Sequence, residues 1–575
     1  MKTNSVRKTI IAGVAAVSLI AAPVQAAFAA PTFLPDVTDE MCEPSYWLER
    51  SAPAVPAAVL KEALATPSNA ERAAADEWAR HRPVRPSAAG NNAGAGQNGS
   101  SEENDIDLVK EAFGAGNTVL AGYDDLQDLN SLFLETDGLN MLDLTKQEET
   151  FDGVRLLQLM WKSGMTEAAP YLGGGYYDST GEPISGPFMV DVLLNMETEE
   201  LSEEQELRYG ICVNRSNLRQ LPSDEIITDA VGDNDFDYFQ LSSLRVNEPV
   251  LVRSISADKA WYYVDTLALS GWVHAEDIAL CRDKEEWMSA WQIPEDRVLV
   301  VTGGKFFLEK SNTSAEVSGR MLTMGTVLEL AEEDEIGERV TNRSVYHNHV
   351  VWLPVREEDG SYTKELALIS EHQPVHEGYL PLTTENILNT AFSMLGDAYG
   401  WGGMLDSNDC SGYLRDIYRC FGLELPRNTT WQAAMPVYKY DTKEMSIEEK
   451  KEILDTLPAG SLLYFNGHGM MYLGKEGDKY YVISSFSSMM DADGVTRRRV
   501  RSVSVNTLDT LRANGHSWLE DIHTMTIPYL GAELIEAKPE DVERTVLVKM
   551  LREAAALKEE EQRRKRVMTG KVSVR

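Results

Sequence analysis

A cysteine and a histidine in the C-terminal half of the chain carry its clearest chemical pattern. Cys410 begins a segment, 410–421, whose apolar residues recur at helical spacing, and Gly422 follows as a stop signal. A thiol in the first turn of a helix lies near unpaired backbone N–H groups and the positive end of the helix dipole, which favour the reactive thiolate. His468 begins a later apolar segment. A cysteine on a helix with a histidine on a later strand predicts papain-like thiol chemistry.

Two short strands must hold that histidine. Residues 468–473 and 480–485 are apolar runs separated by turn residues, which predicts a hairpin. Pairing across this hairpin places Ser484 or Ser485 opposite His468. One of these two hydroxyls is expected to orient the imidazole, which is the role of the third member of a catalytic triad.

Three stretches give this region a family resemblance. They are YGWGG with DCSG, which contain Tyr399 and Cys410, then LPR with WQ around Arg427, and then GHGMMYLG, which contains His468. Together they resemble the NlpC-type papain-like cysteine peptidases of bacterial cell walls. The resemblance covers about residues 380–530 and implies a papain-like catalytic domain.

The resemblance also implies a reaction, the hydrolysis of the bond between γ-D-glutamate and a diamino acid in the stem peptides of murein (peptidoglycan). It implies that Cys410 is the nucleophile, that His468 is the general base and that Tyr399 helps to stabilise the oxyanion. Asp409 and Ser411 match positions that line the substrate subsite. The resemblance implies no cofactor and no metal.

The third triad position and a neighbouring arginine leave alternatives open. The family often has histidine at the third position, and the counterpart here is Ser484, a weaker orienter than histidine, asparagine or a carboxylate. Arg427 is a candidate for binding a carboxylate of the stem peptide. Alternatively its segment is structural, because Thr429 and Gln432 fit a helix capping box.

Upstream of the catalytic region the sequence predicts β-structure. Short β-prone runs between turn residues predict a small barrel over 205–283, and a less regular set predicts a second barrel over 294–378. Both resemble the bacterial SH3-like domains that accompany one branch of the family. In the first barrel the run DNDFDYFQ is predicted to be a solvated loop. By family analogy this loop borders the catalytic groove, so Asp237 is a candidate substrate-binding residue, with Tyr238 and Gln240 beside it.

The whole chain is predicted to be an exported α+β protein of several domains. Residues 1–29 have the basic start, apolar run and small-residue cleavage site of a secretory signal peptide. A helical region follows over 30–203 and contains a flexible linker at 86–105. It resembles the N-terminal stabilising segment of the family branch that carries SH3-like domains. After the two barrels and the catalytic domain comes a charged tail, 537–575, whose basic end is a candidate for association with an anionic surface. No later segment is long and apolar enough to predict a membrane span.

Charge and cysteine content exclude several kinds of site and partner. The formal net charge is −37, and so acidic a chain repels phosphate backbones, which excludes nucleic acid as a partner. Five cysteines without a CxxC pair predict neither a disulfide framework nor a zinc site. His347 and His349 alternate on a predicted strand without a third ligand nearby, so no metal site is expected there.

Two other functions stay open from the sequence. One is a wall-binding protein whose barrels bind murein while a weakened catalytic domain only holds peptide, which Ser484 favours and the intact Cys410, His468 and Tyr399 oppose. The other is an amidase or acyltransferase on the same scaffold, because a nucleophile does not by itself fix the acceptor.

Overall fold

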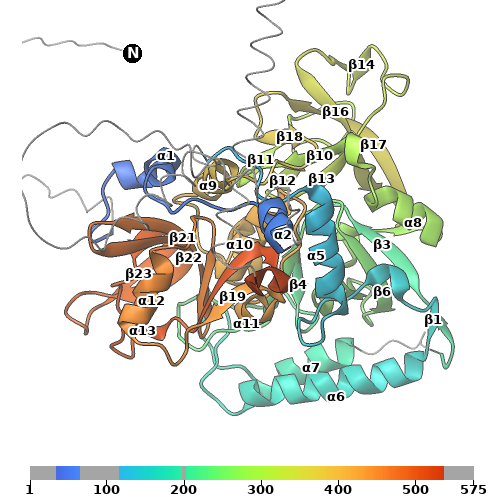
Figure 1. Cartoon of the computed structure of the whole chain (residues 1–575). Coiled ribbons are helices and arrows are strands. Elements are labelled where there is room, and N and C mark those ends of the chain that lie inside the picture. The colour runs from blue at the N-terminus through green and yellow to red at the C-terminus, as the bar shows by residue number, and fades with distance from the viewer. Residues whose placement is uncertain (1–33, 65–115, 197–201, 537–575) are drawn as a thin grey trace, which may run out of the picture.

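A computed structural model of the chain describes residues 34–64, 116–196 and 202–536 (Figure 1). The predicted signal peptide at 1–29, the linker at 86–105 and the tail at 537–575 lie outside these residues. Within the described part of the chain, no helix has the length and hydropathy needed to cross a membrane.

A six-stranded antiparallel sheet forms the centre of the C-terminal unit, in the order β19-β24-β20-β21-β22-β23 (Figure 1). Its strands are β19 (Val437–Asp441), β20 (Leu462–Phe465), β21 (His468–Glu476), β22 (Lys479–Met490), β23 (Arg497–Thr507) and β24 (Thr524–Gly531). The accompanying helices are α9 (Thr384–Phe392), α10 (Cys410–Arg419), α11 (Thr429–Ala434), α12 (Ile447–Leu454) and α13 (Trp518–Asp521).

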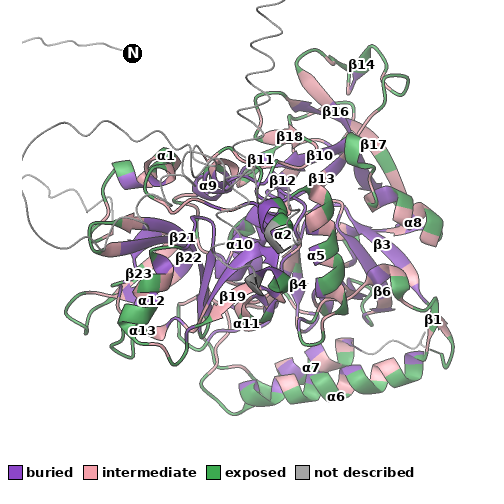
Figure 2. Cartoon of the chain, in the orientation of Figure 1, coloured by how far each residue is buried: buried purple, intermediate pink, exposed green. Residues whose placement is uncertain are grey.

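Helix α10 begins at the predicted nucleophile for a local reason. The Asp409 carboxylate accepts a 2.8 Å hydrogen bond from the Gly412 N–H and so caps the first turn. Every residue from Cys410 to Tyr418 is buried, because the helix lies against β21 and β22 (Figure 2). The predicted helix is therefore confirmed. The predicted hairpin between β21 and β22 is confirmed, but with Met471 opposite Ile483 the register places neither Ser484 nor Ser485 directly opposite His468, contrary to the prediction.

The first barrel region forms a seven-stranded antiparallel sheet in the order β5-β4-β8-β7-β6-β3-β9. Its strands are β3 (Arg208–Cys212), β4 (Ser216–Arg219), β5 (Gln240–Leu244), β6 (Pro249–Ile255), β7 (Trp261–Asp265), β8 (Ser270–His274) and β9 (Ile278–Cys281). Leu218, Val250 and Val264 lie in its apolar core and are fully buried. Helix α8 (Lys284–Trp291) follows the last strand and buries Trp287 against this sheet.

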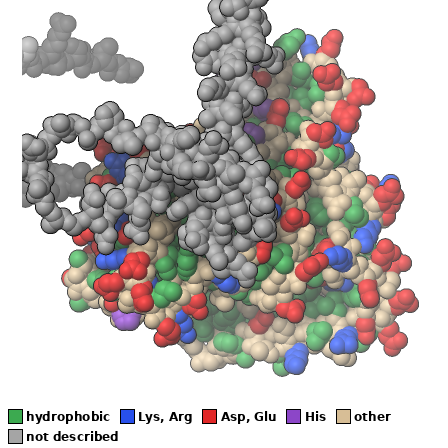
Figure 3. Space-filling model, in the orientation of Figure 1, with side chains coloured by type: hydrophobic (Ala, Val, Ile, Leu, Met, Phe, Trp, Pro, Cys, Tyr) green, Lys and Arg blue, Asp and Glu red, His purple; other side chains and the backbone are tan. Residues whose placement is uncertain are grey.

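A second sheet follows, with five strands in the order β17-β16-β13-β10-β18 and a separate apolar core. These strands are β10 (Val298–Val301), β13 (Val327–Leu330), β16 (Asn348–Arg356), β17 (Tyr362–Ser370) and β18 (Val375–Glu377). Two strand pairs accompany it, β11 (Lys305–Phe307) with β12 (Met321–Thr323) and β14 (Arg339–Val340) with β15 (Arg343–Ser344). Acidic side chains recur over the side of the molecule that carries β16, β17 and α8 (Figure 3). That this region is a second SH3-like barrel stays a prediction.

The described residues of the predicted N-terminal region divide between two cores. Helices α6 (Gly153–Leu172) and α7 (Gly186–Asn195) pack on the first barrel, where Met160 and Met189 share a core with Phe239. The remaining elements pack on the catalytic sheet instead, namely α1 (Pro44–Leu48), α2 (Ala57–Leu64) and α5 (Tyr123–Glu135). Two short strands, β1 (Thr150–Phe151) and β2 (Gln205–Glu206), pair beside α6.

Candidate active site

Cys410 lies in the first turn of α10, against the start of strand β21. The backbone N–H groups of Gly469 and Ser411 point at its sulfur, and Gly469 directly follows His468. The Cys410 side chain is 9% exposed and the His468 side chain 7%. The helix terminus and the hairpin thus bring the predicted nucleophile and the predicted base together at one end of the sheet.

Ser484 holds the imidazole of His468. The Ser484 hydroxyl oxygen lies 3.1 Å from Nε2 of the ring and is fully buried. Ser485, the other serine that the hairpin offered, turns to the opposite face and donates to the Asn408 carbonyl at 2.8 Å. Of the two serines, Ser484 is therefore the one that contacts the imidazole, although its contribution to turnover stays a prediction.

Burial determines the resting charges of the two groups. Burial, with a smaller contribution from Arg512, lowers the pKa of His468 to about 3, so the ring is neutral at physiological pH. Burial and the nearby Asp409 carboxylate raise the pKa of Cys410 to about 12. No hydrogen bond joins the thiol and the imidazole among the described residues. The expectation of a stabilised thiolate is therefore wrong for this state, because loss of hydration outweighs the helix dipole.

A buried ion pair lies behind the nucleophile. Arg427 donates to Asp409 at 2.8 and 3.1 Å, to the Ser411 hydroxyl at 2.9 Å and to the Ser242 hydroxyl at 2.7 Å. Burial raises the pKa of Asp409, but the guanidinium of Arg427 outweighs this effect and holds that pKa below its usual range. All three nitrogens of Arg427 are thus bonded within the protein. The substrate contacts predicted for Asp409, Ser411 and Arg427 stay predictions.

The capping box expected at Thr429 and Gln432 is wrong. The residue that caps α11 is Asn428, whose side chain accepts from the Trp431 N–H at 3.0 Å. Gln432 instead donates to the carbonyl of Ser411 at 3.1 Å. Asn428 thus caps α11 and Gln432 braces the nucleophile helix, while substrate binding by Arg427 stays a prediction.

The turn before the nucleophile, η5 (Trp401–Asp406), has an unusual backbone. Four of its residues have positive φ, among them the non-glycine residues Leu405 at 58° and Asp406 at 50°. L-amino acids rarely adopt this conformation, so surrounding contacts must hold it. The Asp409 carboxylate, which accepts from the Gly402 N–H at 3.1 Å, is one such contact.

The first barrel supplies further contacts to this turn and to Ser407, which follows it. Arg215 donates to the carbonyls of Gly403 at 3.1 Å and Ser407 at 2.8 Å, and Gln240 donates to the Gly402 carbonyl at 3.0 Å. Glycine is required at this approach, because a Cβ on Gly402 would lie 2.7 Å from the Gln240 side chain. The barrel therefore shapes the segment that carries the nucleophile.

The run DNDFDYFQ, residues 233–240, is only partly the solvated loop that the sequence predicts. Asp237 is fully buried, forms an ion pair with Arg219 and accepts from the Ile227 and Phe239 N–H groups. Its carboxylate organises the inside of the loop. The loop does reach the catalytic unit, because the Phe236 ring lies 4.1 Å from that of Trp401, centroid to centroid. A substrate contact of Asp237 stays a prediction.

A second buried contact fixes the barrel to α10. Glu248 of the barrel lies 3.8 Å from both Arg415 and Arg419 of the helix, and Arg245 forms an ion pair with Asp416. Burial raises the pKa of Glu248, but the surrounding guanidinium groups outweigh this effect and hold that pKa at about 2. No sequence pattern indicated this cluster, because its two groups, 245–248 and 415–419, lie far apart along the chain.

Two tyrosines lie near the thiol. Tyr399, the predicted oxyanion donor, is partly exposed, and burial together with the neighbouring Cys410 and Asp409 raises its pKa. Tyr464 of β20 is fully buried and lies within electrostatic reach of Cys410, and Thr526 of β24 lies beside its hydroxyl. Sequence reasoning missed Tyr464, for which the only signal was its place in a strand next to the histidine hairpin.

His347 and His349, at which the sequence predicts no metal site, each have a carboxylate partner. His347 lies 3.4 Å from Glu371 and His349 lies 3.0 Å from Glu377. Within the described ranges, no group of three histidine, cysteine, aspartate or glutamate side chains is arranged to hold a metal ion.

Comparison with known proteins identifies two domains in the chain. Residues 396–504 match the model of the NlpC/P60 family, and residues 228–274 match that of the SH3 domain of SH3b1 type. The chain therefore contains an NlpC/P60 domain and one SH3b domain. A stretch of 92 residues is 33% identical to dipeptidyl-peptidase 6 of Lysinibacillus sphaericus. It covers 16% of this chain and 30% of that protein, so the similarity spans less than a third of the relative.

A solved structure shares the fold of this chain. An NlpC/P60 endopeptidase from Photobacterium damselae subsp. piscicida aligns with a TM-score of 0.56 and 19% identity, over 71% of this chain and 93% of that chain. An NlpC/P60 family protein from Bacillus cereus ATCC 10987 aligns with a TM-score of 0.38 and 17% identity, over 56% of this chain and 99% of that chain.

Proposed function

We propose that this chain is an exported cysteine endopeptidase that hydrolyses the bond between γ-D-glutamate and a diamino acid in murein stem peptides. One observation carries the proposal: an NlpC/P60 domain in which Cys410 begins a buried helix beside the start of strand β21, where Ser484 holds His468. The Photobacterium relative is named an endopeptidase and the Lysinibacillus relative a dipeptidyl-peptidase, which agrees with peptide hydrolysis.

The chemistry starts from a neutral pair. As the Cys410 sulfur attacks the amide carbonyl, the neutral imidazole of His468 accepts the thiol proton, and Tyr399 donates to the oxyanion. The resulting imidazolium gives this proton to the leaving amine as the C–N bond breaks, which leaves a thioester on Cys410. Water, deprotonated by His468, then hydrolyses the thioester and restores the thiol. These steps require no cofactor.

The proposed site of action is the cell wall. An NlpC/P60 domain accompanied by an SH3b domain suggests peptidoglycan as the binding partner, and a signal peptide at 1–29 would place the protein outside the cytoplasm. The basic end of the tail at 537–575 is a further candidate for surface association.

A wall-binding role with little catalysis is the second candidate function. The observation that favours it is the single 3.1 Å contact to Ser484, because a hydroxyl fixes an imidazole less firmly than a carboxylate does. This alternative predicts peptide binding without turnover.

Mass analysis of a defined stem peptide tests the proposed function. The full chain should convert the peptide into two fragments whose joint mass exceeds that of the substrate by one water, with the cut after γ-D-glutamate. In a parallel assay on a muropeptide that keeps its glycan, release of the intact stem peptide would identify an amidase instead. A product in which an added amine replaces water would identify an acyltransferase, and unchanged peptide would favour the wall-binding role.

A further inference from the structure

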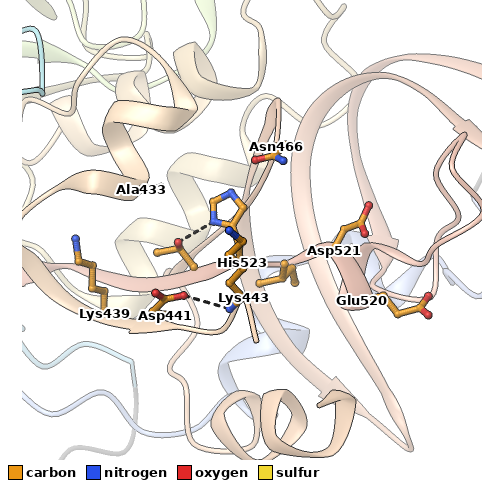
Figure 4. Close-up of a pocket in the computed structure, with 10 residues that line it drawn as sticks. Ala433, Lys439, Asp441, Lys443, Asn466, Glu520, Asp521 and His523 are labelled. Atoms are coloured by element: carbon orange, nitrogen blue, oxygen red, sulfur yellow. Dashed lines mark hydrogen bonds between the residues drawn. The ribbon is translucent and has the colours of Figure 1, made fainter. Parts of the chain in front are cut away.

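A polar pocket of about 570 Å³ opens at the same end of the catalytic sheet as the nucleophile (Figure 4). It is lined from the ends of β19 and α11, the start of β24, helix α13 and the turn between β20 and β21. Asn466 in that turn lies two residues before His468. The mechanism described above does not use this pocket.

The sheet register relates the pocket to the thiol. Gly469, whose N–H points at the Cys410 sulfur, pairs with Tyr464, Tyr464 pairs with Thr524, and Thr524 pairs with Asp441. These four residues form one row across neighbouring strands, and the last two line the pocket. At about 4.8 Å per strand, Thr524 lies about 10 Å from Gly469. An extended peptide covers this distance in about three residues.

The acidic side chains of the pocket are already bonded within the protein. Asp441 accepts from the Lys443 N–H at 3.2 Å, and Glu520 accepts from Ser517 at 2.6 and 2.9 Å. Asp521 accepts from three side chains: Arg512, Asn514 and His516. These carboxylates therefore offer little to a bound cation.

The basic side chains keep unused donors. Lys443 is exposed, and its ammonium has no bonded partner among the described residues. His523 uses Nδ1 on the Thr524 hydroxyl at 2.8 Å, and no partner is bonded to its other ring nitrogen in the described part of the chain. Lys439 donates to two carbonyls at the end of α11, which leaves one of its three hydrogens unused. Figure 4 shows His523 and Lys443 between Lys439 on one side and the two acids of α13 on the other.

We propose that this pocket binds the C-terminal carboxylate of the peptide that leaves during cleavage. The inference rests on the proposed function. It specifies the C-terminus of the stem peptide, which the proposed function leaves open. In amide hydrolysis the leaving fragment carries both the new amine and the original C-terminus. His468 protonates that amine, and the pocket lies just beyond the turn that precedes His468. A C-terminus two or three residues after the cleaved bond therefore reaches Lys443, His523 and Lys439, which donate to its carboxylate.

This assignment selects among forms of the substrate. A stem peptide with a free C-terminus presents a carboxylate to the pocket, whereas a stem peptide joined to another through that carboxyl group presents a neutral amide. The charge-assisted contact is lost in the second case. The site therefore favours stem peptides whose C-terminus is free.

Binding to the full-length Cys410→Ala protein tests the pocket without requiring turnover. The probes are a fluorescent stem peptide with two residues after the γ-D-glutamyl bond and the same peptide as its C-terminal amide. We expect the acid to bind about five- to tenfold more tightly than the amide, because one exposed charge-assisted contact distinguishes them. Adding Lys443→Met should lower this ratio, because it removes the ammonium that is exposed and unbonded among the described residues, while Lys439 and His523 remain.

Lys310→Met is the matched control, since Lys310 is exposed on the second sheet region and outside the pocket; it should keep the parent ratio. Equal binding of acid and amide by the parent, a ratio unchanged by Lys443→Met, or no measurable binding of the acid would each overturn the assignment. Hydrolysis by the wild-type protein is measured separately. A Lys443-dependent ratio without any hydrolysis would reject the proposed function alone, and hydrolysis with an unchanged ratio would reject the pocket alone.

Discussion

The imidazole of His468 is held by a small anchor. The Ser484 hydroxyl contacts Nε2, and the aromatic rings of Phe465, Phe486 and Trp518 surround the ring. The rings restrict where the imidazole can go, while the hydroxyl selects its rotation and tautomer. Aromatic packing can therefore compensate in part for a weak third triad member.

Ser484→Ala tests whether the hydroxyl orients the imidazole in addition to the aromatic packing. Without the hydroxyl, a buried ring nitrogen loses its partner, so we expect kcat to fall about tenfold with little change in KM. Ser485→Ala, which removes a hydroxyl on the opposite face of the same strand, is the comparison and should affect kcat less. Steady-state kinetics on a soluble stem peptide measure both. Equal losses in the two variants would show that Ser484 is not the orienting group.

The charge of the thiol is a second question at this scale. With its pKa raised to about 12, Cys410 should react with iodoacetamide at a rate that keeps rising between pH 8 and pH 10. Cys42→Ser is the suitable background, because Cys42 is the one partly exposed cysteine of the described residues. Peptide mapping by mass assigns the label. A rate that reaches a plateau below about pH 8.5 would show that the free enzyme already holds a thiolate.

At the scale of elements, the strained turn η5 and helix α10 act as one part. The turn has left-handed residues directly before the nucleophile, and Arg215 and Gln240 of the first barrel bond its carbonyls. The short motifs around Cys410 and His468 predicted the helix and the hairpin, because local periodicity determines both. The barrel contacts lie beyond such a prediction, since Arg215 and the turn are far apart in sequence and meet only in the folded chain.

Arg215→Met should lower kcat more than it raises KM. The turn would lose two hydrogen bonds and Cys410 would be less well positioned, for which we expect a fall of about tenfold in kcat. Arg215→Lys should recover part of the loss, because it keeps a donor at the carbonyls. Arg208→Met removes another arginine of the same barrel, whose guanidinium lies over the Tyr262 ring, and should leave kcat near the parent value. Unchanged kcat in Arg215→Met would contradict a positioning role.

At the scale of the whole molecule, the catalytic unit extends beyond the predicted boundaries of 380–530. Trp47 is fully buried against Tyr481 of the catalytic sheet, with ring centroids 5.0 Å apart, and Phe133 of α5 belongs to the same core. Asn130 also donates to the Gly422 carbonyl at 2.8 Å. The sequence predicted helices here but not where they pack. An amphipathic pattern shows that a helix has an apolar face, but it does not show which surface that face packs against.

Trp47→Ala should therefore destabilise the catalytic unit although it lies far from it in sequence. Emptying a fully buried indole site is expected to lower the free energy of unfolding by about 3–5 kcal/mol. Trp352→Ala, at a partly buried tryptophan on the second sheet, should cost less. Both variants are unfolded in urea, and the loss of peptide hydrolysis at each urea concentration reports the unfolding of the catalytic unit. Equal stability of Trp47→Ala and the parent would show that the N-terminal helices are not part of this core.

The measurement that tests the central claim most directly compares two cysteines of the same helix region. Cys410→Ala and Cys420→Ala are incubated with a defined stem peptide, and the products are identified by mass. Cys420 is fully buried at the far end of α10, so its replacement should keep cleavage after γ-D-glutamate. Cys410→Ala should retain the parent's circular dichroism spectrum and release no fragments. Release of the same fragments by Cys410→Ala at the parent rate would contradict a thiol mechanism at this site.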